Sequence, residues 1–71
     1  MAKWSENTAQ EMRELVSVHG FSNAAVAQLK TDAGKWADMI GKEKSKLFDV
    51  GNHQVRVTAS NHEVTRVELA V

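Results

Sequence analysis

The sequence contains no cysteine, no proline and no excess of charge of either sign. Without cysteine, disulfides and thiolate sites for zinc or iron–sulfur clusters are excluded, so a metal would need histidine and carboxylate ligands. Nine Lys and Arg residues balance nine Asp and Glu residues, so the chain as a whole does not attract nucleic acid electrostatically. We expect no cofactor.

Long apolar runs are also missing, and the N-terminal segment Met1–Ser5 lacks the apolar centre of a signal peptide. These absences predict a cytoplasmic protein without a membrane segment. The 71 residues are enough for a single domain, 1–71, with one core. Chains this short often need a disulfide, a metal or a partner subunit for stability, and here only the last two remain.

Two amphipathic helices are predicted in the N-terminal part. Ser5 is suited to cap the first, over about residues 5–19, and Gly20 can end it in the left-handed conformation. Ser22 can then cap a second helix over about residues 23–44. Apolar residues recur along one side of this second helix, at Val26, Leu29, Ala33, Trp36 and Ile40.

Gly34 lies inside the second predicted helix and costs it about 1 kcal/mol relative to alanine. We expect the helix to continue through Gly34, because the apolar seam keeps its phase from Val26 to Ile40. The alternative is a break at Thr31–Gly34, which would suit a winged-helix fold.

After Lys46 the apolar period changes from 3.6 to 2, which predicts strands. Gly51-Asn52 forms a two-residue hairpin turn that places Phe48 opposite Val55. We therefore expect an α+β domain in which the N-terminal helical hairpin precedes a three-stranded antiparallel β-meander. The three strands are expected at about residues 46–50, 53–60 and 64–71.

The second turn decides how the last two strands align. A two-residue loop would place Val57 opposite Arg66, whereas a three-residue loop, 61–63, places it opposite Val67. We expect the three-residue loop, because it gathers the apolar side chains of both strands on one face.

The three histidines are the obvious candidates for a metal or acid–base site. They fall at a helix end (His19), a strand start (His53) and a turn (His62), and no two have the spacing of metal ligands. The sequence also lacks a phosphate-binding loop and a nucleophile elbow. We therefore expect a protein that is not an enzyme, with no catalytic, cofactor-binding or metal-binding residues.

Basic residues provide a candidate surface for nucleic acid. Lys35, Lys42 and Lys46 would lie within about 40° of one another on the second predicted helix. Asp32 and Asp38 flank this stripe, and Arg56 is expected to pair with Glu68 across two strands. Binding of nucleic acid is therefore the alternative rather than the main expectation. The candidate residues are Lys35, Lys42, Lys46, Arg56 and Arg66.

The order of the predicted elements resembles the first half of HU-type histone-like DNA-binding proteins. The most similar motifs are Ser22-Asn23-Ala24-Ala25 before the long helix and Val50-Gly51-Asn52 in the first hairpin, and the resemblance extends over about residues 8–57. The chain lacks the long basic arm and the terminal helix with which that family grips DNA. The resemblance implies at most the dimerisation half of such a fold.

The main expectation is a small non-catalytic protein-interaction module: a self-assembling subunit, most simply a homodimer, or an inhibitor or adaptor that acts by surface contact. The first predicted helix is too short to cover the second, and the strands have two edges that no proline closes. The second helix and one sheet edge are the candidate contact surfaces. Trp36 is expected to fill the junction of helix and sheet or to anchor a partner. The residues expected at the contact are Trp36, Ile40, Leu69 and Val71.

Overall fold

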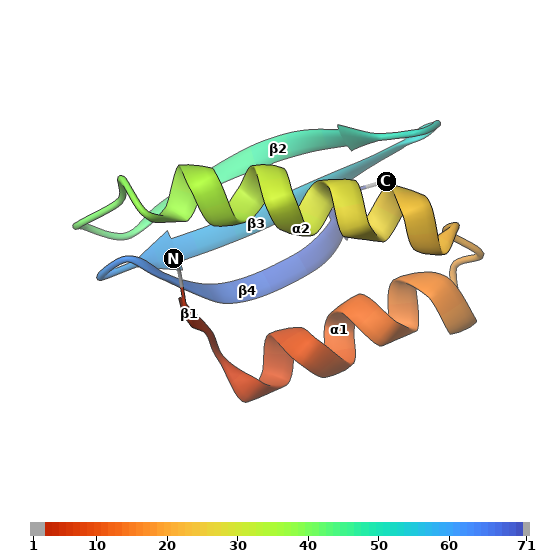
Figure 1. The fold of residues 1–71 in the computed structure, drawn as a ribbon, viewed down its shortest axis with the longest axis horizontal. Coiled ribbons are helices and arrows are strands. Elements are labelled where there is room, and N and C mark those ends of the chain that lie inside the picture. The colour runs from red at the N-terminus through yellow and green to blue at the C-terminus, as the bar shows by residue number, and fades with distance from the viewer. Residues whose placement is uncertain (1–2, 71) are drawn as a thin grey trace.

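Two helices and a mixed sheet of four strands make up the part of the chain that the computed structural model describes, residues 3–70 (Figure 1). The strands lie in the order β1-β4-β3-β2, with β1 parallel to β4 and the other pairs antiparallel. The predicted α+β class is confirmed, but the sheet is not a simple three-stranded meander. The elements are β1 (Lys3–Trp4), α1 (Glu6–Ser17), α2 (Asn23–Ala37), β2 (Lys44–Val50), β3 (His53–Ser60) and β4 (Glu63–Ala70).

The additional strand, β1, carries no signal in the sequence because two residues are too few to show a period. Its register places Trp4 beside Val64, and the Ser5 N–H donates to the Val64 carbonyl at 3.1 Å. Trp4 is half-buried and packs against the core. The chain thus enters the sheet before it enters the first helix.

The predicted start of α1 is confirmed, and the helix ends at Ser17, two residues before the predicted end at about residue 19. Ser5 is the N-cap residue, although its hydroxyl donates to the Asn7 Oδ1 atom at 2.6 Å instead of accepting a helix N–H. Gly20 has a φ of 75°, and the Phe21 N–H then donates to the Leu15 carbonyl at 2.9 Å. This turn brings Phe21 into the core, where it is 6% exposed.

Helix α2 runs without interruption through Thr31–Gly34, so the continuous helix is confirmed and the break required by a winged-helix fold is absent. The side chain of Ser22 caps its first turn by accepting the Ala25 N–H at 3.0 Å. The predicted seam is also correct for its central residues, since Leu29 and Ala33 are buried at 3% and 0% exposure.

The C-terminal end of α2 was predicted wrongly. The helix ends at Ala37 and not at about residue 44, because the turn between β3 and β4 binds the next carbonyl groups. The N–H groups of Asn61 and His62 donate to the carbonyls of Gly41 and Ile40 at 2.9 and 2.8 Å. His62 also places its Nδ1 atom 2.8 Å from the Asp38 carbonyl, which can only accept, so that nitrogen carries the proton. The seam residue Ile40 still reaches the core, and β2 starts earlier than expected, at Lys44.

The alignment of β3 with β4 follows the predicted register by a different route. The loop has two residues, Asn61 and His62, both with positive φ (57° and 63°), and not three. A β-bulge next to Ala59 then adds one residue on β4, which restores the pairing of Val57 with Val67. The predicted pairing is therefore confirmed, while the predicted loop length is wrong.

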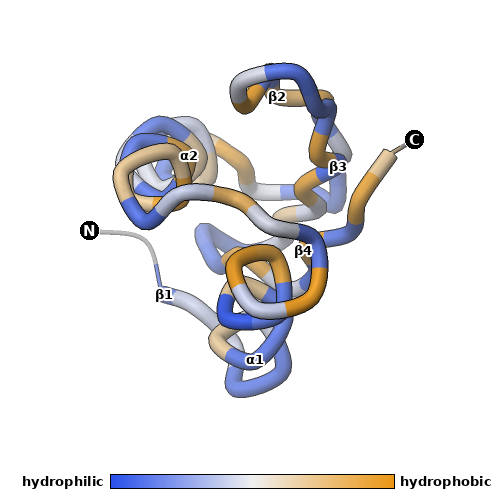
Figure 2. Tube along the Cα trace, turned by 90° about the vertical axis from the view of Figure 1, so that its right-hand side faces the viewer, coloured by the Kyte–Doolittle hydropathy of each residue, from blue (hydrophilic) through white to orange (hydrophobic). Residues whose placement is uncertain are grey.

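The core lies between the helices and one face of the sheet. Seen from the side, the sheet curves around α2, and α1 lies along β4 (Figure 2). Val55, Val57, Val64 and Val67 supply the sheet side of the core, with exposures of 2% or less. From Val55 to Ala59 every second residue of β3 is buried, as the sequence period of two predicts.

Removing the Ser22 cap is expected to destabilise the fold moderately. In Ser22→Ala the Ala25 N–H loses its acceptor, which costs about 1 kcal/mol of unfolding free energy. Ser22→Asp keeps an acceptor oxygen and should stay close to wild type. Urea denaturation of the three proteins measures the difference, and equal midpoints for Ser22→Ala and Ser22→Asp would contradict it.

Candidate functional site

The basic residues considered for nucleic acid do not form one surface. Lys35 lies in the last turn of α2, Lys42 follows that helix and Lys46 lies in β2, so the stripe predicted for a continuous helix is wrong. Lys46 places its Nζ atom 5.3 Å from the centre of the Phe48 ring. On the opposite face of the sheet, Arg56 lies 3.9 Å from Glu68, which confirms the predicted ion pair and compensates its charge. Arg66 is exposed on that same opposite face, two residues from Glu68 on β4.

The residues considered for a partner contact also differ in their accessibility. Ile40 is 8% exposed and belongs to the core, so it does not lie on an accessible contact surface as predicted. Trp36 is half-buried between α2 and the sheet, with its ring 5.8 Å from that of Phe48 in an edge-to-face arrangement. Leu69 is half-buried against the core, and Val71 lies outside the described residues.

The histidines have separate structural surroundings. The His53 ring stacks on the Phe21 ring, with their centroids 4.6 Å apart. His62 lies beyond the other end of β3 and forms a hydrogen bond with the carbonyl of Asp38, directly after α2. Within residues 3–70, no group of three or more histidine and acidic side chains is placed to hold a metal ion.

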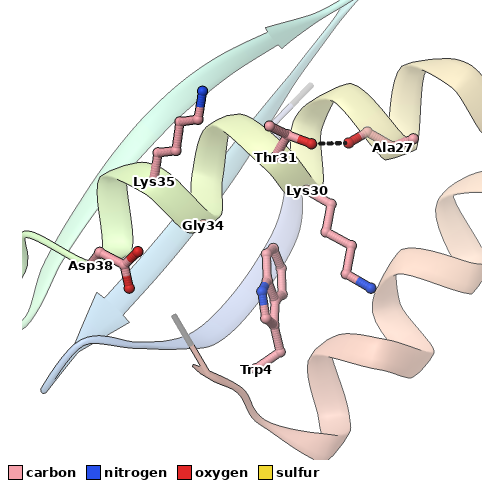
Figure 3. Close-up of a pocket in the computed structure, with 7 residues that line it drawn as sticks. All are labelled: Trp4, Ala27, Lys30, Thr31, Gly34, Lys35 and Asp38. Carbon is pink, nitrogen blue, oxygen red and sulfur yellow. Dashed lines mark hydrogen bonds between the residues drawn. The ribbon is translucent and has the colours of Figure 1, made fainter. Parts of the chain in front are cut away.

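A shallow groove of about 630 Å³ separates Trp4 from α2 (Figure 3). Trp4 lies beside α2 at Gly34, where the helix carries no side chain. The charged ends of Lys30 and Lys35 point away from each other. The groove is mostly apolar, and its polar groups do not converge on one point. Its lining residues are Trp4, Ala27, Lys30, Thr31, Gly34, Lys35 and Asp38.

The outer edge of β4 is closed by β1 and by side chains of α1. β1 pairs with Glu63 and Val64. Farther along, the Asn7 side-chain amide donates to the Thr65 carbonyl at 3.1 Å, and the Val67 N–H donates to the Glu11 carboxylate at 3.2 Å. Helix α1 thus takes the place of a neighbouring strand as far as Val67.

The other edge of the sheet, β2, is open. Because the backbone of Val67 faces α1, the backbone of its partner Val57 faces β2. Val57 pairs with Lys46, whose backbone therefore faces β3. Neighbouring residues point to opposite sides, so three N–H and three C=O groups face away from the sheet, and within residues 3–70 no strand pairs with them. They belong to Ser45, Leu47 and Asp49.

Leu47 is the one large apolar side chain described on the outer face of the sheet. It lies opposite Arg56, is 47% exposed, and has polar neighbours across β3 and β4. The fold itself gives Leu47 no core contact that would explain a leucine at this position. We name the outward backbone groups of β2 together with the Leu47 side chain the β2 edge.

Leu47 is not among the contact residues predicted from the sequence. Strand alternation contains the necessary signal, because inward-facing Phe48 and Val50 place Leu47 on the polar face. An apolar residue there has no role in the core of the chain itself. The prediction of a helix reaching residue 44 placed the start of β2 too late for this pattern to be clear.

Among the described residues, neither helix is long and apolar enough to cross a bilayer. Comparison of the chain with family models, with curated proteins and with solved structures finds no match.

Proposed function

We propose that this chain is a small non-catalytic protein-interaction module that works by strand pairing at the β2 edge. The observation that carries the proposal is the contrast between the two edges of one sheet. Side chains of α1 form hydrogen bonds with backbone groups at the edge of β4. In β2, within residues 3–70, no strand pairs with the backbone groups that face outward. An extended segment that aligns with β2 gains backbone hydrogen bonds at little ordering cost to the module.

Charge supports this function over the nucleic-acid alternative. The candidate lysines and arginines lie on different faces, and the ion pair between Arg56 and Glu68 removes part of the positive charge of the outer face. A protein that binds DNA through phosphates needs a continuous basic surface.

A peptide with the sequence of residues 43–51, labelled with fluorescein, tests strand pairing directly. We expect saturable binding to the wild-type protein, with a dissociation constant between about 10 µM and 1 mM, as measured by fluorescence anisotropy. A labelled DNA duplex should bind weakly at physiological salt.

Leu47→Pro is the decisive variant for this test. Proline removes an N–H that faces away from β3, so the pairing of β2 with β3 keeps its hydrogen bonds. We expect this variant to retain its circular dichroism spectrum and to lose peptide binding. Peptide binding that is unchanged in Leu47→Pro would contradict the proposal. Submicromolar, steeply salt-dependent binding of the duplex would favour the nucleic-acid alternative instead.

A further inference from the structure

We infer that the partner at the β2 edge is a second copy of this chain, with the two β2 strands antiparallel and Leu47 opposite Leu47 of the second copy. The inference rests on the proposed function and specifies its partner. A two-fold axis perpendicular to the sheet would pass between the two leucines, and one continuous sheet would run through both copies.

The backbone of β2 favours this register over its neighbours. Hydrogen-bonded pairs can form only between residues whose backbone groups face outward, which are Ser45, Leu47 and Asp49. With Leu47 on the axis, all three find such a partner, and about six backbone hydrogen bonds form. A shift by two residues in either direction leaves about four, because one of the three then lies opposite the turn or the loop before β2.

Side chains on the inner face disfavour one of the two shifted registers. Shifting the pairing so that Lys46 lies on the axis would place two ammonium groups directly opposite each other, which is unfavourable. In the inferred register Lys46 lies opposite Phe48 of the second copy. That pairing reproduces the contact that Lys46 already makes with Phe48 in its own chain, at 5.3 Å.

Side chains on the outer face are also complementary. Leu47 gains an apolar neighbour, which lowers the exposed fraction of its own side chain. Ser45 lies opposite Asp49 of the second copy. The Ser45 hydroxyl is 2.8 Å from that of Thr58, and it has one donor and two lone pairs, so it can accept from Thr58 and donate to the carboxylate.

The lysines of β2 and the closed β4 edge limit the assembly to two copies. Charged side chains that point inward on an edge strand discourage random pairing. Here Lys44 and Lys46 lie on the inner face, while the two-fold axis uses each β2 edge once. The second sheet edge is covered by β1 and, as far as Val67, by side chains of α1, so assembly stops at the dimer.

Single cysteines test the register, because the natural chain has none. In Leu47→Cys the two Cα atoms would lie about 5.5 Å apart, which suits a disulfide. In the matched control Ser45→Cys they would lie about 14 Å apart along the strands, which is too far. Under mild oxidation at about 50 µM protein, Leu47→Cys should form disulfide-linked dimers at least ~10-fold faster than Ser45→Cys. A mixture of Ser45→Cys with Asp49→Cys should cross-link between the two variants.

Equal cross-linking rates for Leu47→Cys and Ser45→Cys would overturn the inference. If Leu47→Cys does not fold, sedimentation velocity of Leu47→Lys, of Leu47→Glu and of their mixture tests the same register. Each variant alone should be monomeric, and the mixture should dimerise. A monomeric mixture overturns the inference as well. If the 43–51 peptide still binds wild type and not Leu47→Pro, strand pairing at the β2 edge stands and only the inferred dimer register is rejected. If peptide binding is absent as well, the proposed function is contradicted too.

Discussion

Leu15→Ala is expected to lower the free energy of unfolding by about 2–5 kcal/mol. Leu15 projects from α1 into the core and is 3% exposed. Alanine at this position loses the burial of the side chain and leaves a cavity between α1 and the sheet. A domain of this size has a total stability of about 4–10 kcal/mol, so the variant should lose a large part of its stability and unfold at a clearly lower urea concentration than the wild type.

Val18→Ala is the matched control for Leu15→Ala. Val18 follows α1 directly and is 69% exposed, so its replacement should change the stability by no more than about 0.5 kcal/mol. Urea denaturation followed by circular dichroism, at several protein concentrations, separates unfolding from dissociation of a dimer. Similar losses in the two variants would show that α1 does not pack on the sheet as described.

The sequence was sufficient for the parts of the fold that depend on local signals. Ser22 and Gly20 identify the junction of the helices, because a hydroxyl cap and a positive φ are properties of single residues. The hairpin between β2 and β3 also follows from a short motif at Gly51. The alternation of buried residues in β3 needs no long-range information.

Long-range hydrogen bonds decided the features that the sequence analysis missed. Helix α2 ends at Ala37 because the backbone N–H groups of Asn61 and His62 bind carbonyls that follow the helix, and each pair is at least 20 positions apart in the sequence. Ile40 is apolar and buried either as a helical residue or as a loop residue, so the seam did not distinguish the two structures.

The register of β4 shows how one correct prediction can rest on an incorrect turn. The apolar pattern requires Val57 to face Val67, and the chain satisfies it with a two-residue loop and a bulge. The bulge leaves the Thr65 carbonyl directed toward α1, where the Asn7 side chain binds it. The sequence pattern fixes which faces meet, but it does not distribute the extra residue between loop and strand.

Glu11 illustrates the same limit on the prediction of the candidate site. In the sequence Glu11 and Glu14 are equivalent acidic residues of an exposed helix, and only the structure shows that Glu11 closes the edge of β4. This difference determines that β2, and not β4, is the open edge. The proposed function therefore depends on a side chain whose role has no local signal.

Glu11→Ala is expected to reduce the unfolding free energy by about 1–3 kcal/mol, because the Val67 N–H loses its acceptor beside the core. The Val67 amide should also exchange with solvent deuterium faster than in the wild type, since its backbone hydrogen bond is replaced by transient contact with water. Glu11→Gln keeps a carbonyl oxygen at the same place and should retain most of the protection.

Glu14→Ala serves as the control for the loss of an acidic side chain from α1. Glu14 is exposed, and the Gln10 amide that contacts its carboxylate at 3.5 Å is exposed too, so its removal should have little effect on stability. Hydrogen–deuterium exchange of the four proteins, together with urea denaturation, separates the two positions. If Glu11→Ala and Glu14→Ala lose the same stability and Val67 stays protected in both, α1 does not close the β4 edge. In that case the β4 edge would be open beyond its pairing with β1, and the arrest of assembly at a dimer would lose its physical basis.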